Sequence, residues 1–229
     1  MNSILPPRTV SEKNLFHLLA LVAYAILACV MTLPLVLNLS DHLLGTDSNA
    51  LNDTYFNVWI FGWQAHQLIA DPLHLFQGNI FYPFPNTLAF SEIMLPGALL
   101  YLPFAYATGN PVLSYNLVIL LTFPLNGFAM YLFALDWLNL TAARRPLTAD
   151  HHYPSAVVRR PSAVASFLAG LIFAFCTYKM GELRHVQLLM AMFMPLTLMY
   201  VARLLRVPSF HNAFFTPLFF ALNALCSLY

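Results

Sequence analysis

Carboxylates in one polar segment between long apolar runs are the residues of this sequence best suited to chemistry. Asp53 and Asn57 are four positions apart, so a helix that begins near Asp53 would present both side chains on one face. A carboxylate placed in this way either activates a hydroxyl by accepting its proton or only caps the helix. For Asp47, the alternative to a catalytic role is that of a solvated loop acid. Glu92 directly precedes an apolar segment, where it is either a functional group or a helix cap.

Basic residues in the later segment YKMGELRHVQ offer the complementary chemistry. This segment holds Lys179, Arg184 and His185. A guanidinium fork matches the oxygens of a phosphate, so basic groups here would grip a phosphate while the acids activate a hydroxyl. In the alternative interpretation, Lys179 and Arg184 extend to lipid headgroups and His185 is a satisfied loop residue.

The composition restricts the solvent in which these residues act. Hydrophobic residues make up 60% of the chain and charged residues 8%, whereas a soluble domain has about 25% charged residues. The net charge of +1 argues against a nucleic-acid partner, which would need a basic stripe. We therefore predict an all-α membrane protein, a polytopic helix bundle.

Five apolar runs have the length expected of membrane-spanning helices. They cover residues 15–37, 112–135, 163–178, 186–205 and 213–229. Together they predict a single transmembrane domain over residues 1–229. Because the last run is still apolar where the chain stops, we expect a chain truncated at its C-terminus, part of a longer bundle.

The segment 93–107 is apolar but only 15 residues long, and it contains Pro96, Gly97 and Pro103. A helix of that length reaches ~22 Å, less than the ~30 Å of a hydrocarbon core. If the segment is re-entrant, 8 of the 10 basic residues lie on one side, which is then cytoplasmic. This topology places the N-terminus in the cytoplasm and the loop 38–92 outside.

Aromatic residues indicate how the outer loop meets the membrane. Trp59 and Trp63 are four positions apart, on a face next to that of Asp53, and Trp often anchors a helix at the headgroups. We predict an amphipathic helix lying on the outer surface, with its Trp side in lipid and Asp53 facing a cavity. The run from Tyr82 to Asn86 contains two prolines and predicts a rigid turn.

Several of these motifs resemble the N-terminal part of a family of large, mostly uncharacterised bacterial membrane proteins that look like GT-C-type glycosyltransferases. The similar stretches are DTYFNVWIFGWQAHQLIADPLHLFQGNIFYPFPNTLAFSE, TGNPVLSYNLVILL and AGLIFAFCTYKMGELRHVQLL. The family pattern is an acid, Asn-x-Trp-x-x-x-Trp, Asp-Pro, Asn-x-Phe-Tyr-Pro, Ser-Glu and a later His-x-Gln. These elements correspond here to Asp53, Asn57–Trp63, Asp71–Pro72, Asn79–Pro83, Ser91–Glu92 and His185–Gln187.

The resemblance implies a membrane enzyme that takes a sugar from a polyprenyl-phosphate donor at the periplasmic face of the bacterial inner membrane. It implies that Asp53 is the catalytic carboxylate and a ligand of a divalent cation, Mg²⁺ or Mn²⁺. The supporting catalytic candidates are Asp47, Glu92 and His185. The implied substrate contacts are Asn57, Trp59, Trp63, Tyr82, Lys179 and Arg184. Lys179 departs from the family pattern, which commonly has Arg there, and a lysine lacks the forked phosphate contact.

Two other functions stay open at the level of sequence. The chain could be a non-catalytic scaffold, or a fragment that pairs with a second chain supplying further spans. It could also be a transporter or flippase, whose acids usually lie in the middle of a span. No full span here carries an acid in its middle, which argues against transport.

Overall fold

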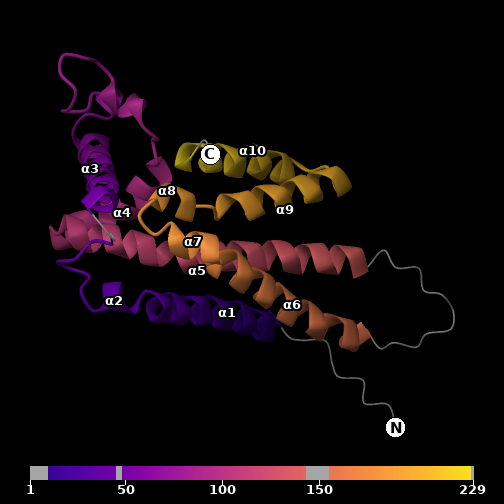
Figure 1. The fold of residues 1–229 in the computed structure, drawn as a ribbon. Coiled ribbons are helices and arrows are strands. Elements are labelled where there is room, and N and C mark those ends of the chain that lie inside the picture. The colour runs from indigo at the N-terminus through magenta and orange to yellow at the C-terminus, as the bar shows by residue number, and fades with distance from the viewer. Residues whose placement is uncertain (1–9, 45–47, 143–154, 228–229) are drawn as a thin grey trace, which may run out of the picture.

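The computed structural model describes residues 10–44, 48–142 and 155–227, and these form helices with no β-strand among them (Figure 1). In chain order the elements are α1 (Val10–Met31), α2 (Leu33–Val36), α3 (Ser48–Ala70), η1 (Pro72–His74), η2 (Thr87–Phe90), α4 (Leu95–Thr108), α5 (Pro111–Ala142), α6 (Ser155–Phe175), α7 (Thr177–Gly181), α8 (Val186–Leu189), α9 (Phe193–Arg206) and α10 (Phe210–Cys226). The predicted all-α class is confirmed for this part of the chain.

Four segments of the described chain are long and apolar enough to cross a membrane. They are Asn14–Met31, Pro111–Thr141, Ala163–Gly181 and Val186–Arg206. They overlap four of the five predicted spans, and the fifth corresponds to α10, an apolar helix of 17 residues. These apolar helices are compatible with a multi-pass membrane protein.

Glycines allow the central helix α5 to pack closely against α1 and α6. A methyl group at Gly170 of α6 would lie 2.2 Å from the Tyr24 hydroxyl and 2.3 Å from the Gly127 carbonyl oxygen. The fully buried Tyr24 hydroxyl donates a hydrogen bond to the Phe167 carbonyl at 2.8 Å. Small residues let helix backbones approach in lipid, where apolar burial alone does not drive association.

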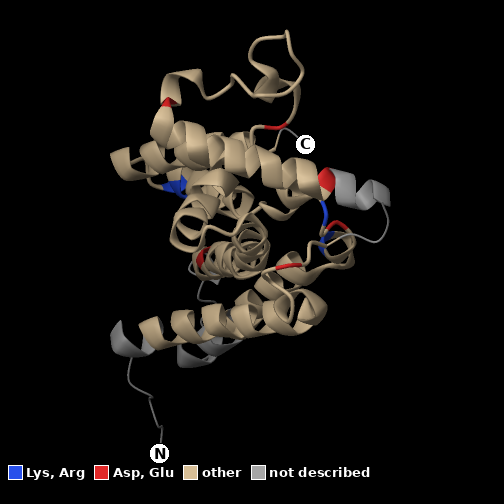
Figure 2. Cartoon of the chain, turned by 90° about the vertical axis from the view of Figure 1, so that its left-hand side faces the viewer, with Lys and Arg blue, Asp and Glu red and all other residues tan. Residues whose placement is uncertain are grey.

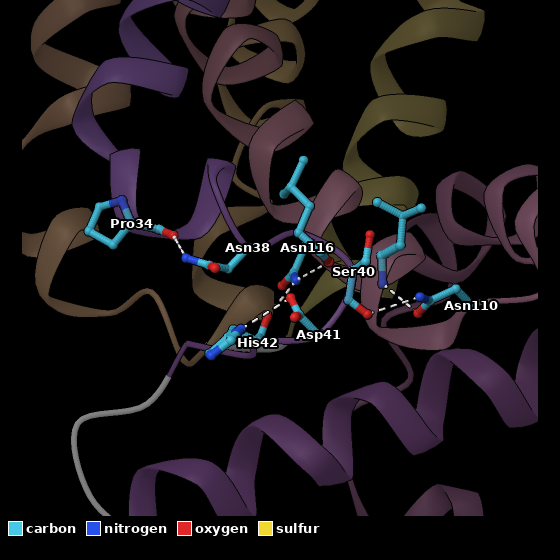
Figure 3. Close-up of polar contacts among 9 residues, drawn as sticks. Pro34, Asn38, Ser40, Asp41, His42, Asn110 and Asn116 are labelled. Carbon is cyan, nitrogen blue, oxygen red and sulfur yellow. Dashed lines mark hydrogen bonds and ion pairs between the residues drawn. The ribbon is translucent and has the colours of Figure 1, made fainter.

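Two polar anchors mark the opposite ends of α5. Near its start, Asn116 donates hydrogen bonds to the carbonyls of Leu39 and His42, at 2.8 and 2.7 Å (Figure 3). Near its end, Asp136 accepts two hydrogen bonds from Arg203 of α9, at 2.8 and 3.1 Å. The two anchors are 20 residues apart on one helix, which corresponds to ~30 Å, the thickness of a hydrocarbon core.

Helix α3 crosses the end of the bundle where α5 begins, rather than running along it (Figure 1). The view onto this end shows α3 in front of the bundle helices (Figure 2). Ile60 and Phe61 of α3 are fully buried. A methyl group at Gly97 of α4 would lie 2.5 Å from Phe61 and 2.7 Å from the Met190 sulfur, so α4 packs directly under α3.

Helix α4 covers most of the segment predicted to be re-entrant. It ends at Gly109, which has a φ of +64°, and Asn110 then leads directly into α5. The Asn110 side chain donates to the Ser40 carbonyl at 2.9 Å, in the cluster of contacts that surrounds Asn116 (Figure 3). The C-terminal end of α4 therefore lies beside the segment that leaves the first span, while the re-entrant path through lipid stays a prediction.

Candidate functional site

Three ionisable side chains meet at the end of the bundle where α3 lies. The Nε2 atom of His185 is 3.4 Å from Oδ2 of Asp53, and its Nδ1 atom is 2.5 Å from Oε2 of Glu182. The Asp53 side chain is 56% exposed, whereas those of His185 and Glu182 are about one quarter exposed. The imidazole thus lies between the exposed carboxylate of Asp53 and the mostly buried carboxylate of Glu182.

The start of α3 is held in place by neighbouring backbone. The buried Thr54 donates its hydroxyl to the Leu44 carbonyl at 2.9 Å. Helix α3 begins at Ser48, so the prediction that a helix starting near Asp53 would use it as a cap is wrong. The residue types around Asp53 are typical of a helix cap. In the structure, however, the Thr54 hydroxyl donates to the Leu44 carbonyl, and the helix begins at Ser48. Asp53 therefore projects from within the helix.

Asn57, one turn after Asp53, joins α3 to the second polar segment. Its Nδ2 atom donates to the Arg184 carbonyl at 3.2 Å, and only 5% of the residue is exposed. Asn57 as a substrate contact stays a prediction, and in the structure its amide nitrogen has a backbone partner. This bond fixes the backbone directly before His185, so it sets the distance between the imidazole and Asp53.

The second polar segment is a tight turn between α7 and α8. The backbone N–H groups of Glu182 and His185 donate to the carbonyls of Tyr178 and Glu182, at 3.1 and 2.9 Å. The turn brings Glu182 and His185 onto one face, where their side chains pair. Glu182 was not among the predicted site residues. The signal that could have found it is its position three residues before His185.

Two basic residues next to this turn each have a buried nitrogen atom with no hydrogen-bond acceptor within the described part of the chain. Lys179 is 5% exposed, and its Nζ atom lies 4.4 Å from the centroid of the Phe173 ring. The Nε atom of Arg184 is buried and also unpaired. Lys179 therefore does not extend to lipid headgroups, the alternative left open by the sequence. A buried cation without an acceptor is costly, and an anionic ligand would relieve that cost.

The predicted tryptophans bind the loop that follows α3. The indole N–H groups of Trp59 and Trp63 donate to Asn79 Oδ1 and to the Leu75 carbonyl, both at 3.0 Å. Their rings stack with centroids 6.3 Å apart. They line an open groove of about 470 Å³, together with Val58, Gly62, His66, Asn79, Tyr101 and Pro111. The polar edges of the indoles are thus turned to protein and not to lipid headgroups.

The remaining predicted residues are not part of the Asp53–His185–Glu182 cluster. Glu92 Oε1 accepts a hydrogen bond from the Ser227 hydroxyl at 2.7 Å, which ties it to the end of α10. The Oε2 atom of Glu92 is buried and has no partner within the described residues. Tyr82 is 96% exposed on the loop between η1 and η2. Asp47 lies outside the described residues.

The fit to a divalent cation is partial. Asp53 and His185 are the side chains that could bind one here, and no group of three or more His, Cys, Asp or Glu able to hold a metal occurs among residues 10–44, 48–142 and 155–227. Mg²⁺ takes about six ligands, mostly oxygens and water. The described residues therefore do not form such a site by themselves. What they do form is a positioned carboxylate and imidazole pair, with Lys179 and Arg184 in the same chain segment as His185.

Comparisons with known proteins do not assign the chain to a family. Family models, curated proteins and solved structures give no match to the chain.

Proposed function

We propose that this chain forms part of a GT-C-type membrane glycosyltransferase, which takes a sugar from a polyprenyl-phosphate donor at the periplasmic face of the bacterial inner membrane. The observation that carries the proposal is the 3.4 Å approach of His185 Nε2 to Asp53 Oδ2. Helix α3, which follows the first span, and the turn after α7 supply the two groups. The sequence resemblance supplies the donor class.

In the proposed reaction, the Asp53 carboxylate accepts the proton of an acceptor hydroxyl. The acceptor oxygen forms a bond to the anomeric carbon of the donor sugar while the bond from that carbon to the phosphate oxygen breaks. Polyprenyl phosphate leaves with the electron pair. Proton transfer to a positioned carboxylate contributes about 10²–10⁴-fold to a rate. His185 is a positioning residue here, because Glu182 orients its ring and its Nε2 atom faces Asp53.

The unpaired cations suit the phosphate of this donor. Lys179 lies in the last turn before Glu182, whose backbone N–H donates to the Lys179 carbonyl at 3.3 Å. Arg184 lies directly before His185. Preorganised positive groups stabilise the charge that develops on a leaving phosphate. This role would account for a buried Lys179 amine that has no acceptor among the described residues.

The groove beside Trp59 and Trp63 lies on α3, the helix that also carries Asp53, and we assign the rest of the substrate to it. Trp59 is six positions after Asp53, which corresponds to ~9 Å along the axis of a helix and to another face of it. Aromatic faces with a few polar groups at the edge, here His66 and Asn79, are typical of pockets that bury an organic ligand.

The test compares Asp53→Asn with Asp71→Asn in the full-length gene product, in membrane vesicles supplied with a panel of polyprenyl-phosphate sugars. Asp71 is a matched control, because it also lies next to a histidine, with Oδ2 2.7 Å from His74 Nδ1. We expect Asp53→Asn to lower transfer by about 10²–10⁴-fold and Asp71→Asn to leave it unchanged. Transfer is measured by mass spectrometry of the product.

The same pair of variants separates the proposed enzyme from a non-catalytic scaffold. Unchanged transfer by Asp53→Asn would remove the catalytic assignment. Absence of transfer from every donor of the panel, in a protein that folds and reaches the membrane, would favour the scaffold.

A further inference from the structure

Large aromatic side chains are exposed together on the loop 79–91, which we call the aromatic loop. Phe81, Tyr82, Phe84 and Phe90 are between 54% and 96% exposed. The Phe90 ring lies 6.0 Å from the Phe81 ring and 6.3 Å from the Phe84 ring, centroid to centroid. Three phenylalanine rings therefore form a contiguous apolar patch, with Tyr82 beside it in sequence. A contiguous exposed patch of this kind usually marks an interaction surface.

The backbone holds these rings outward in one conformation. The Phe84 N–H donates to the Phe81 carbonyl at 3.0 Å and closes the turn. At the base of the loop, the Asn86 N–H donates to Gln77 Oε1 at 3.0 Å, and the Thr87 hydroxyl donates to the Gly78 carbonyl at 3.1 Å. Phe81 has a φ of +58°, in a region that bulky residues rarely occupy and that costs free energy. The fold thus maintains a loop that exposes aromatic rings.

The charge of the surrounding sequence limits the partner. Residues 72–91 contain no Lys, Arg, Asp or Glu, and His74 is their only histidine. A partner recognised through ionic contacts, such as a nucleic acid or a charged peptide, finds no complement here. Uncharged segments rich in Tyr and Phe are suited to the boundary between lipid headgroups and acyl chains.

The position of the aromatic loop places it beside the apolar outer face of the bundle. Figures 1 and 2 both show it projecting sideways from the end where α3 lies, on the side of α10. The Ser227 hydroxyl bonds to Glu92, so the end of α10 is tied to the residue that follows the loop. Phe210, Phe214 and Phe220 of α10 are also exposed. The aromatic loop therefore lies on the side of the bundle that carries α10, an apolar helix with exposed aromatic residues.

We propose that the aromatic loop rests in the headgroup–acyl boundary of the lipid leaflet at the α3 end, with the rings of Phe81, Tyr82, Phe84 and Phe90 in contact with lipid. The loop then fixes the depth of α3, because Trp59 and Trp63 bind residues 75 and 79 at its base. This interaction does not depend on the proposed glycosyl transfer.

The experiment measures the depth of single spin labels in vesicles of phosphatidylethanolamine and phosphatidylglycerol. Cys29, Cys176 and Cys226 are first replaced by Ala, and labels are attached to Tyr82→Cys or Phe84→Cys, whose native side chains are exposed. Two control positions bracket the scale. Asp41→Cys marks the aqueous phase, since its side chain is 71% exposed in a polar segment. Leu198→Cys marks lipid, since Leu198 is exposed on α9 within a candidate span.

We expect the ratio of collisions with oxygen to collisions with a water-soluble nickel complex at positions 82 and 84 to exceed the Asp41→Cys ratio several-fold. It should remain below the Leu198→Cys ratio. A ratio equal to that at position 41 would overturn the proposal, because the loop would then lie in water. Low collision rates with both reagents would also overturn it, since they would mean that protein covers the loop. Circular dichroism and gel-filtration profiles equal to those of the cysteine-free protein verify that each variant is folded.

Discussion

His185 Nε2 lies 3.4 Å from Asp53 Oδ2, although the two residues are 132 positions apart in the chain. The contact exists because α3 crosses the end of the bundle and because the Asn57 amide binds the backbone at Arg184. Glu182 holds the other ring nitrogen. The open carboxylate of Asp53 is therefore positioned by an imidazole that is itself fixed from both sides.

The coupling between Asp53 and His185 predicts non-additive effects on transfer. His185→Gln should lower transfer by at least about tenfold, and adding it to Asp53→Asn should cause little further loss, because the two groups act as a unit. The measurement is the initial rate of sugar transfer for both single variants and the double variant. His74→Gln is the control, since His74 forms a similar pair with Asp71 outside the site. Independent, multiplicative losses would contradict the coupling.

Close helix packing predicts that Gly170→Ala destabilises the protein. The added methyl group would lie 2.2 Å from the Tyr24 hydroxyl and 2.3 Å from the Gly127 carbonyl oxygen. Overpacking of this kind costs about 1–3 kcal/mol. Thermal unfolding in detergent micelles measures the effect. Gly181→Ala is the control, because among the described residues no atom outside its own turn of helix lies within 4 Å of the added methyl group. Equal melting temperatures for the two variants would show that α5 and α6 are not packed this closely.

The anchor at the start of α5 predicts a large effect of Asn116→Ala. Asn116 is fully buried and donates to two carbonyls, so its loss leaves both acceptors unpaired (Figure 3). The two bonds are part-buried, and the loss of each such hydrogen bond costs about 0.5–1.5 kcal/mol. Asn38→Ala is the matched control, since Asn38 makes one exposed hydrogen bond, to the Pro34 carbonyl. Unfolding in denaturant should show a markedly lower midpoint for Asn116→Ala alone. A larger loss for Asn38→Ala would contradict the assignment.

The two ends of α5 predict opposite labelling in cells. Asp41→Cys, beside Asn116, should react with a membrane-impermeant maleimide in intact cells, and Pro208→Cys, in the turn after Arg203, should react only after permeabilisation. The contrast follows from the ~30 Å that separates Asn116 from Asp136 along one helix. Both native side chains are exposed, and the background lacks the native cysteines. Labelling of both positions in intact cells would contradict a membrane-spanning α5.

Much of the bundle is predictable from composition and length, since a span must be apolar for about 20 residues and such a run is visible in one sequence. The segments that contain Asp53 and His185 were also identifiable, because polar and ionisable residues next to apolar runs are few. Helix boundaries were less predictable. Thr54 has the chemistry of a cap, yet its hydroxyl binds Leu44 and α3 begins at Ser48.

Only the tertiary structure decided which of these residues meet. Glu92 and His185 both looked catalytic in the sequence, but the fold ties Glu92 to Ser227 and brings His185 to Asp53. The fold also places Glu182 beside His185 and buries the side chain of Lys179. The Asn57 amide binds backbone, and the indoles of Trp59 and Trp63 bind the loop after α3. The physical reason is the separation in sequence over which each property is determined. Apolar length and polarity are local properties of a segment, whereas a distance between side chains depends on how α3 crosses helices far along the chain.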